Sequence, residues 1–390
     1  MDSSGHEPPH LPLFLNTREH WGRSIARGAV RAARLAVEWT PFLCESEASL
    51  EAKVKAPAAE VAWAGVIGQF YPPHHELLAG LRAAGIPVVN ISSAPPPPGV
   101  GWIHCDDFAC GAMAARHFLE RGYCHFAFLG ITGAHFSDER QRGFVETLRV
   151  EGRTGARTLA GHFSGDAGAS AKLADELRAL PAPCAVFAAN DVRARHCLHA
   201  ALGAGIAVPE SLSILGVDDD DLQCNMARVA LSSVCADWTR IGERAVEHLV
   251  RTSRTGRGRS RQEVVAPLGV TVRQSTDQLA VEDALAARAL RRIHSWGQTK
   301  LSPENLAAEL GVSRRTLERH LVHAVGRSVH AAIFEARLQR AYRMVVETSL
   351  PVGEIAARTG FSKHSHLNAA FKKRFSATPM SLRRAEALGK

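Results

Sequence analysis

The sequence lacks the features that mark membrane and secreted proteins. No apolar run approaches the roughly 20 residues that a membrane helix needs. The N-terminal stretch, with Asp2, Glu7 and scattered prolines, has neither the basic region nor the apolar core of a signal peptide. We therefore expect a cytoplasmic protein with no membrane partner.

Cysteine patterns that bind metals or form disulfide frameworks are also missing. The eight cysteines contain no CxxC pair, and all of them lie before residue 236. We expect reduced, mostly buried thiols. The sequence therefore predicts no zinc site, no other metal and no cofactor.

Positive charge, by contrast, is concentrated at one end of the chain. The 390 residues carry a net charge of +8 and are long enough for two or three domains. From residue 278 onward there are 19 Lys and Arg against 9 Asp and Glu, a net of +10, which leaves −2 for the first 277 residues. A solvated basic face would explain this imbalance, but cations that displace counterions from phosphate would explain it equally.

The same basic segment contains one short pattern twice. Residues 306–313 (LAAELGVS) are echoed by residues 355–362 (IAARTGFS). Each copy has an apolar helical pattern, then a Gly turn, then a Ser that can cap a second helix. This is the pattern of a helix-turn-helix. The coincidence with the positive charge favours DNA binding over a merely solvated face.

The chain before residue 277 alternates strand-like and helix-like segments. The predicted strands are 11–15, 65–68, 87–91, 125–130, 185–189 and 213–217. The predicted helices are 23–37, 76–84, 108–121, 140–149, 168–180 and 192–202. Several helices end at a Gly, the usual residue after a helix. This alternation predicts parallel, doubly wound sheets, with enough units for two lobes.

Polar side chains follow several of these strands. They are Asn16, Gln69, Asn190, Asp191 and the run Asp218–Asp221. Ligands of such folds bind at the carboxyl ends of strands, and amides and carboxylates suit sugar hydroxyls, which both donate and accept. Arg140 can add a forked donor. Singly, each residue can equally be a turn former or helix cap, and the aspartate run lacks the spacing of a calcium loop.

Several stretches resemble known regulator families. Residues 106–130, 140–144, 188–191 and 206–219 resemble the LacI-type regulatory core, which has a periplasmic-binding-protein fold. Residues 371–375 with Thr378-Pro379 resemble the end signature of the AraC family. The resemblance implies an α/β two-lobed periplasmic-binding-protein-like sensor domain followed by an all-α double helix-turn-helix domain.

The resemblance also implies domain bounds. A tail covers 1–10, the effector-binding domain 11–277 and the AraC-type domain 278–390. The latter contains a first helix-turn-helix at about 302–324, a linker helix at about 329–347 and a second helix-turn-helix at about 351–375. It places the Arg-rich stretch 251–261 in a surface loop, although a nucleic-acid arm is an alternative.

Roles follow for the effector residues. By motif, Arg140 and Asp218 hold sugar hydroxyls, and Asn190 lies at a comparable edge. Asp191 and Asp219 are neighbours with less defined roles, and Asn16 is a candidate by its position after a strand. Gln69 stands where the resemblance leads us to expect an acidic residue. Because Gln both donates and accepts, the exact sugar stays open.

Roles also follow for the DNA-binding residues. In the first helix-turn-helix the outward residues are Arg314, Arg315, Glu318 and Arg319. In the second they are Lys363, His364, Ser365 and Asn368, followed by Lys372, Lys373 and Arg374 as predicted phosphate contacts. By family position the base readers are Arg315, Glu318 and Arg319, then His364, Ser365 and Asn368. Departures at His366-Leu367, Ala369 and Ser376 predict that the second unit reads bases less strongly.

The linker helix predicted at 329–347 bears on how the two units reach DNA. Its 19 residues would span about 28 Å, which can set two recognition helices about one DNA turn apart. Any small helical domain can contain such a helix, so this spacing is an interpretation rather than a specific signal.

These patterns predict a DNA-binding transcriptional regulator with no enzymatic activity. We expect an activator of sugar-catabolism genes, controlled by a pentose such as D-xylose that closes the two lobes. The expected partners are an operator in double-stranded DNA, RNA polymerase and a second copy in a homodimer. One alternative keeps the regulator but changes the effector to another polyol or a purine.

An enzymatic alternative is a DNA-repair fusion with a nucleophilic Cys. Cys105 with His104 and Cys197 with His196 are the nearest pairs, but adjacent strand residues point to opposite faces. A transport receptor with the same fold is disfavoured by the missing signal peptide.

Overall fold

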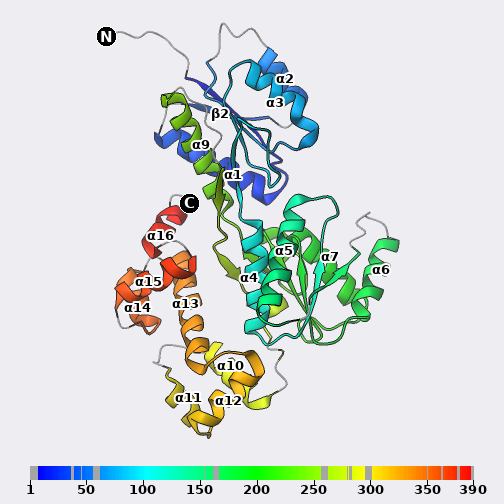
Figure 1. The fold of residues 1–390 in the computed structure, drawn as a ribbon, viewed down its shortest axis with the longest axis vertical. Helices are drawn as coiled ribbons and strands as arrows, with labels where there is room; N and C mark the ends of the chain where they lie inside the picture. Colours follow the sequence, from blue (N-terminus) through cyan, green and yellow to red (C-terminus); the bar gives the residue numbers. More distant parts are fainter. Residues whose placement is uncertain are drawn as a thin grey trace. The chain divides into compact units, whose positions relative to one another are not determined.

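The computed structural model describes residues 8–36, 39–44, 46–55, 62–153, 155–160, 167–255, 262–278, 280, 283–294, 301–348, 350–361, 363–375 and 378–387. The chain divides into two compact units, shown in Figure 1. Unit 1 comprises Met1–Asp107 and Ala236–Pro267, and unit 2 comprises Phe108–Cys235 and Leu268–Leu388. Most of the predicted tail 1–10, the Arg-rich positions 257, 259 and 261, and positions 362 and 376 of the second helix-turn-helix lie outside the described residues.

Unit 1 is built on a six-stranded sheet in the order β11-β5-β4-β3-β1-β2, with every strand pair parallel. The strands are β1 His10–Phe14, β2 Thr40–Cys44, β3 Val66–Gly68, β4 Val88–Asn90, β5 Gly101–Cys105 and β11 Gln262–Val265. The helices are α1 His20–Ala36, α2 Glu47–Lys55, α3 His75–Ala83 and α9 Trp238–Thr255. An all-parallel sheet is buried on both faces, which explains why β3 and β4 have no exposed residue.

Glycines let two helices of unit 1 approach each other closely. A Cβ on Gly28 of α1 would lie 2.0 Å from the carbonyl oxygen of Thr239, and one on Gly242 of α9 would lie 2.1 Å from that of Ile25. No side chain fits at either position. The two helices, which are 200 residues apart in sequence, therefore pack backbone against backbone.

Unit 2 contains a second six-stranded sheet in the order β12-β10-β9-β8-β6-β7. The strands are β6 His125–Leu129, β7 Arg157–Leu159, β8 Cys184–Ala188, β9 Leu212–Val217, β10 Ser232–Cys235 and β12 Gly269–Thr271. Among the described strands of this sheet, β10 and β12 pair antiparallel and the other neighbours pair parallel. The helices of this α/β part are α4 Asp107–Glu120, α5 His135–Val150, α6 Ala167–Arg178, α7 Asp191–Gly203 and α8 Asp221–Asn225. Strands β8 and β9 are buried throughout, as a central parallel strand should be.

Seven helices follow the second sheet in the part of unit 2 that the structure describes. They are α10 Ala284–His294, α11 Pro303–Glu309, α12 Arg314–Val325, α13 Val329–Glu347, α14 Val352–Arg358, α15 His364–Phe375 and α16 Pro379–Ala387. Two separate apolar clusters hold them: one around Leu306, Leu317 and Leu321, the other around Ile355, Leu367 and Phe371. Among the described residues, none of the helices is both long and apolar enough to cross a membrane.

The predicted fold class is confirmed: two α/β sheets precede a helical region with two helix-turn-helix units. All six predicted strands are present within a residue or two of their expected bounds. The sequence analysis missed β2, β5, β7, β10, β11 and β12. These strands have little apolar alternation: β5 reads GWIHC and β7 reads RTL, so neighbouring strands, and not their own pattern, define them.

Candidate effector site and DNA-binding surface

An arginine–aspartate pair lies at the carboxyl end of the sheet in unit 2. Arg140 of α5 is 2% exposed. Its Nη1 donates to the carbonyl oxygen of Ala189, after β8, at 2.5 Å, and lies 3.7 Å from Oδ1 of Asp218, after β9. The guanidinium also lies 5.0 Å from the ring centre of Phe136. Two of the predicted residues are therefore brought together.

Close packing between helices fixes the position of Arg140. A Cβ on Gly111 of α4 would lie 1.9 Å from the Arg140 carbonyl oxygen, and one on Gly143 of α5 would lie 2.0 Å from that of Phe108. The backbones of α4 and α5 thus touch at the turn that carries Arg140. Such preorganisation suits a group that binds a ligand.

The backbone at Asp218 is strained. Its φ is 117° and that of Asp219 is 53°, and they are the only residues other than glycine with positive φ among those the structure describes. Such conformations cost about 1–3 kcal/mol each and cluster at functional sites. The Asp218 amide nevertheless donates to the Val234 carbonyl oxygen at 3.0 Å, which holds the residue at the strand end.

The predicted contact Asp191 is directed into unit 2 and is 1% exposed. Ser233 Oγ donates to its Oδ1 at 2.6 Å, and the Asp220 amide donates to its Oδ2 at 2.8 Å. A Cβ on Gly216 would lie 2.1 Å from Oδ1, so Gly216 makes room for this carboxyl. Burial, and secondly the Asp218 carboxylate, raise the pKa of Asp191 well above its usual range. Asp191 thus ties α7 to the loop that follows β9.

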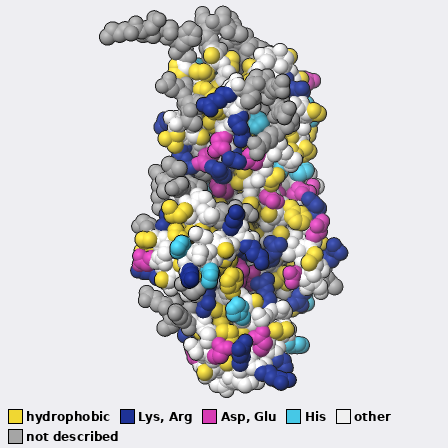
Figure 2. Space-filling view, turned by 60° about the vertical axis from the view of Figure 1, so that its left-hand side comes forward, with side chains coloured by type: hydrophobic (Ala, Val, Ile, Leu, Met, Phe, Trp, Pro, Cys, Tyr) yellow, Lys and Arg dark blue, Asp and Glu magenta, His cyan; other side chains and the backbone are white. Residues whose placement is uncertain are grey.

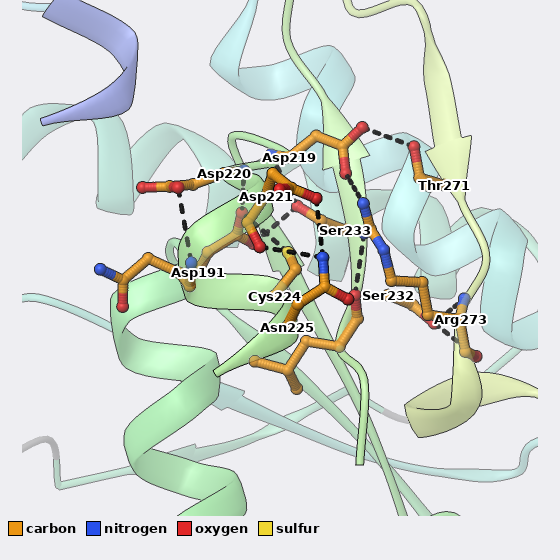
Figure 3. A network of polar contacts seen from close by, with 12 residues as sticks. Asp191, Asp219, Asp220, Asp221, Cys224, Asn225, Ser232, Ser233, Thr271 and Arg273 are labelled. Atoms are coloured by element: carbon orange, nitrogen blue, oxygen red, sulfur yellow. Dashed lines mark hydrogen bonds and ion pairs between the residues drawn. The ribbon is translucent and has the colours of Figure 1, made fainter. Parts of the chain in front are cut away.

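Asp219 is also held by groups of unit 2. Thr271 Oγ1 donates to its Oδ2 at 2.6 Å, and Arg273 Nη2 lies 2.8 Å from its Oδ1. Figure 3 shows Asp219 pointing toward both partners. Asn190 caps α7: its Oδ1 accepts from the Arg193 amide at 2.9 Å, which leaves its NH₂ group as a donor. Sequence reasoning gave no role to Arg273, because a link between positions 54 apart has no local signal.

Unit 1 carries two further predicted residues. Asn16 follows β1 and is exposed, and its Oδ1 accepts from the Arg18 amide at 3.2 Å. Gln69 follows β3, and its side chain hydrogen-bonds to Tyr71 Oη. Beside them Asn90, fully buried after β4, accepts from the Phe70 amide at 2.9 Å. The sequence analysis missed Asn90, although it is also the polar end of a strand.

The first helix-turn-helix consists of α11, a turn and α12. Ser302 and Ser313 cap the two helices, accepting from the Asn305 amide at 3.1 Å and the Thr316 amide at 3.0 Å. Gly311, in the turn, has a φ of 71° that favours glycine. Leu317 and Leu321 are fully buried, which turns the other face of α12 outward.

That outward face of α12 carries the predicted DNA contacts. It bears a shallow groove lined by Arg314, Arg315, Glu318, Arg319 and Val322. Arg315 and Arg319 are exposed. Arg314 pairs with Glu304 of α11 at 2.5 Å. Glu318 is half-buried, and its Oε2 accepts from the Val329 amide at 3.1 Å, so its carboxylate caps the next helix. Figure 2 shows Lys and Arg side chains, in dark blue, at the lower edge of the view, where Figure 1 places α11 and α12.

The second helix-turn-helix consists of α14, a turn at Gly360 and α15. Lys363, His364 and Ser365 are exposed at the start of α15 and line a shallow hollow with α14. Asn368 is half-buried. Its Oδ1 has no hydrogen-bond partner among the described residues.

One predicted phosphate contact is placed differently by the structure. Lys372 and Lys373 are exposed, as expected. Arg374, however, lies with Nε 3.3 Å from Glu335 Oε1 of α13, and its side chain is 22% exposed. We correct the prediction for Arg374 because α15 turns successive residues by about 100°, which directs it inward while its two neighbours face solvent.

Comparisons with known proteins agree with this architecture. A periplasmic binding protein-like domain matches residues 115–276, and a helix-turn-helix domain matches residues 306–385. Over 383 residues the chain is 27% identical to the xylose operon regulatory protein of Escherichia coli strain K12, covering 96% of each chain. The chain is a transcriptional regulator that joins these two domains.

Two further matches cover most of the regulator. The xylose operon regulatory protein of Haemophilus influenzae is 28% identical over 333 residues, with 82% of this chain and 84% of the relative covered. A solved structure of the xylose-binding transcription activator XylR matches with a TM-score of 0.61 and 26% identity, covering 97% of this chain and 98% of that one. These relatives are regulators and not enzymes, which confirms the prediction of a regulator without enzymatic activity.

Proposed function

We propose that this regulator responds to a small sugar, with a pentose such as D-xylose as the first candidate. The observation that supports it is the Arg140–Asp218 pair at the strand ends of unit 2, where the buried guanidinium and the strained carboxylate are already in place. A forked donor beside a carboxylate matches vicinal hydroxyls, which donate and accept. The relatives named for xylose point to the same class of effector.

The proposed effector contacts are Arg140, Asp218 and Asn190 from unit 2, with Asn16 and Gln69 from unit 1. Asp191 and Asp219 enter the proposal as residues that hold the loop after β9, because protein groups already occupy their carboxyl oxygens. At position 69 the resemblance leads us to expect a carboxylate, which only accepts hydrogen bonds, whereas the Gln69 amide both donates and accepts. It is therefore the position at which the choice of sugar is decided.

The proposed DNA contacts divide into two kinds. Arg315 and Arg319 read bases from α12, and His364, Ser365 and Asn368 do so from α15. Arg314, Lys363, Lys372 and Lys373 contact phosphate. Glu318 positions α13.

In this proposal the protein works in the cytoplasm as a homodimer, recruits RNA polymerase and activates sugar-catabolism genes. The effector acts only through different affinities for two conformations.

A thermal-shift screen tests the effector. Full-length protein is heated with D-xylose, other pentoses, hexoses, polyols and purines, because a ligand that binds the folded state raises Tm by mass action. We expect a shift with D-xylose that Asp218→Ala abolishes. The matched control is Asp221→Ala, in the same aspartate run but exposed. A shift with a purine and none with any sugar would overturn the sugar assignment while leaving the regulator.

A further inference from the structure

The carboxylates at the strand ends of unit 2 are connected to a second set of buried polar groups. Asp218, which pairs with Arg140, is followed by Asp219, and the Asp219 carboxylate contacts Arg273 Nη2 at 2.8 Å. Arg273 Nη1 also donates to the Leu231 carbonyl oxygen at 2.9 Å. The Asp219 carboxylate therefore connects the loop after β9 directly to Arg273 (Figure 3).

The backbone of Arg273 continues the connection to Ser232 of β10. The Arg273 amide donates to Ser232 Oγ at 2.8 Å, and Ser232 Oγ donates to the Arg273 carbonyl oxygen at 3.0 Å. Thr276 Oγ1 lies 2.7 Å from the same hydroxyl. Because Ser232 has one proton and gives it to Arg273, Thr276 must be the donor in this third bond.

The direction of that bond determines the next one. Thr276 Oγ1 has used its proton, so it accepts from His117 Nε2 of α4 at 2.9 Å. His117 Nδ1 accepts from Arg121 Nη1 at 3.1 Å, and Arg121 Nε donates to the Thr276 carbonyl oxygen at 2.9 Å. Ser232 and Thr276 are fully buried and His117 is 5% exposed. The bonds from Arg121 through His117 and Thr276 to Ser232 run in one direction, and such bonds in a buried chain reinforce one another.

The far end of this chain meets the helices of the DNA-binding region. The Arg121 carbonyl oxygen accepts from the Ala280 amide at 2.8 Å. The neighbouring Glu120 lies 3.0 Å from Arg327, in the segment between α12 and α13. Burial, and secondly Glu335 of α13, raise the pKa of Glu120 above its ordinary value. The end of α4 is therefore in electrostatic contact with the segment that joins the two helix-turn-helix units.

The junction is not close-packed. A cavity of about 180 Å³ is lined by His117, Glu120 and Arg121 of α4 on one side and by Arg327, Glu335 and Arg374 on the other. In a close-packed interior, side chains have little space in which to change their positions. The cavity leaves space beside the charged side chains at the end of α4.

We infer that the chain Asp219–Arg273–Ser232–Thr276–His117–Arg121 couples the Arg140–Asp218 pair to the helix-turn-helix region. The inference rests on the proposed effector site. When a ligand reorients Asp218, the adjacent Asp219 changes its hold on Arg273, and the buried bonds carry the change to the end of α4. Glu120 and Arg121 then alter their contacts with Arg327 and Ala280. Thr276 is a positioning residue, since its hydroxyl touches neither ligand nor DNA.

Hydrogen exchange of the full-length protein with and without D-xylose tests the inference. In the wild type we expect D-xylose to slow exchange severalfold in β9 and its following loop, and to change it in α4, α10 and α12. Thr276→Val keeps the side-chain shape but breaks the chain of bonds. It should retain the effect in β9 and lose the effect in α10 and α12.

Two controls keep the outcome decisive. Thr359→Val removes an equally buried hydroxyl, bonded to the Ile355 carbonyl oxygen, and should leave the transmitted change intact. If Thr276→Val does not fold, Ser232→Ala breaks the chain one bond earlier. Persistence of the D-xylose effect in α10 and α12 of the folded variant would overturn the inference.

A protein that does not bind D-xylose would contradict the proposed pentose and not the coupling. In that case Asp218→Asn replaces the ligand as the perturbation. We expect Asp218→Asn to change exchange in α10 and α12 in the wild-type background and to have no such effect together with Thr276→Val. An equal effect in both backgrounds would reject the coupling chain.

Discussion

The two helix-turn-helix units share a backbone plan and differ in almost every side chain that matters for DNA. In the first unit both helices have serine caps, and two exposed arginines, Arg315 and Arg319, lie on the outer face of α12. In the second unit α14 begins at Val352, and Pro351 at the N-cap position makes no side-chain cap. Its recognition helix offers His364, Ser365 and a half-buried Asn368. The outer face of α12 therefore presents two charged guanidinium groups, whereas α15 presents shorter, mostly uncharged side chains.

This difference leads us to expect base recognition mainly from the first helix-turn-helix and phosphate contact mainly from the second. An Arg fork can grip guanine by two hydrogen bonds in the major groove, and two such forks one turn apart read adjacent bases. Two exposed cations of the second unit, Lys372 and Lys373, lie at the end of α15, where an ammonium suits phosphate better than a base edge. The first unit should therefore set sequence preference and the second should add affinity.

The largest difference between the units should appear in base reading. We expect Arg319→Ala to weaken operator binding by about 1–3 kcal/mol and to relax preference at one position. Asn368→Ala in the second unit should have a smaller effect. Fluorescence anisotropy on the operator and on single-base variants measures both. An equal loss on every sequence would make Arg319 a phosphate contact.

Helix capping provides a second contrast. Ser313→Ala removes the hydrogen bond to the Thr316 amide and should lower the free energy of unfolding by about 1 kcal/mol. Pro351→Ala, at the corresponding position before α14, removes no side-chain cap and should change it far less. Urea denaturation of the full-length variants compares the two. A loss at Pro351 as large as that at Ser313 would contradict the role of the cap.

The same contrast shows what the sequence could reveal. Capping serines, turn glycines and apolar spacing are local signals, so both helix-turn-helix units and α13 were predicted within about two residues. The inward turn of Arg374 was not, because it depends on Glu335, 39 positions earlier in another helix. The contact of Glu318 with the Val329 amide was likewise not predicted, since that amide belongs to the next helix.

The effector residues illustrate the same limit. Strand-end position predicted Asp218 as part of a polar cluster, because parallel strands bring their ends to one edge, and the resemblance to the LacI-type core added Arg140. It could not separate Asp218, beside Arg140, from Asp191, whose carboxyl is filled by Ser233 and Asp220. That distinction depends on Gly216, where the absence of a Cβ leaves room for Asp191.

Salt dependence distinguishes the cations within α15. Lys372→Ala and Lys373→Ala should each reduce the slope of log affinity against log salt by about 0.9 and weaken binding severalfold on all sequences. Arg374→Ala should leave the slope unchanged, because its guanidinium pairs with Glu335. Affinities measured from low to moderate salt provide the test. A unit change in slope for Arg374→Ala would restore it to the DNA-facing surface.

One pH-dependent contribution to the free energy of unfolding should affect the first helix-turn-helix and not the second. Asp283 caps α10, accepting from the Ala286 amide at 2.9 Å, and its other oxygen contacts His320 Nδ1 of α12 at 2.6 Å. The amide bond first, and His320 second, hold the pKa of Asp283 below its ordinary value. A lowered carboxyl pKa stabilises the folded state above the unfolded pKa, near 4. This contribution is lost as the pH falls through the folded value.

Asp283→Asn isolates the charge, since Asn caps a helix about as well as Asp. At neutral pH the variant should be less stable by a few tenths of a kcal/mol, because solvent screens the partly exposed contact between the Asp283 carboxylate and His320. This deficit should shrink as the pH falls below about 4 and should vanish only below the still lower folded pKa of Asp283, where the carboxyl is uncharged. Hydrogen exchange of α10 and α12 between pH 3 and 7, compared with α14 and α15, measures it. A similar pH effect in α14 and α15 would show that the substitution loosens the whole helical region, because no carboxylate occupies the corresponding position at Pro351.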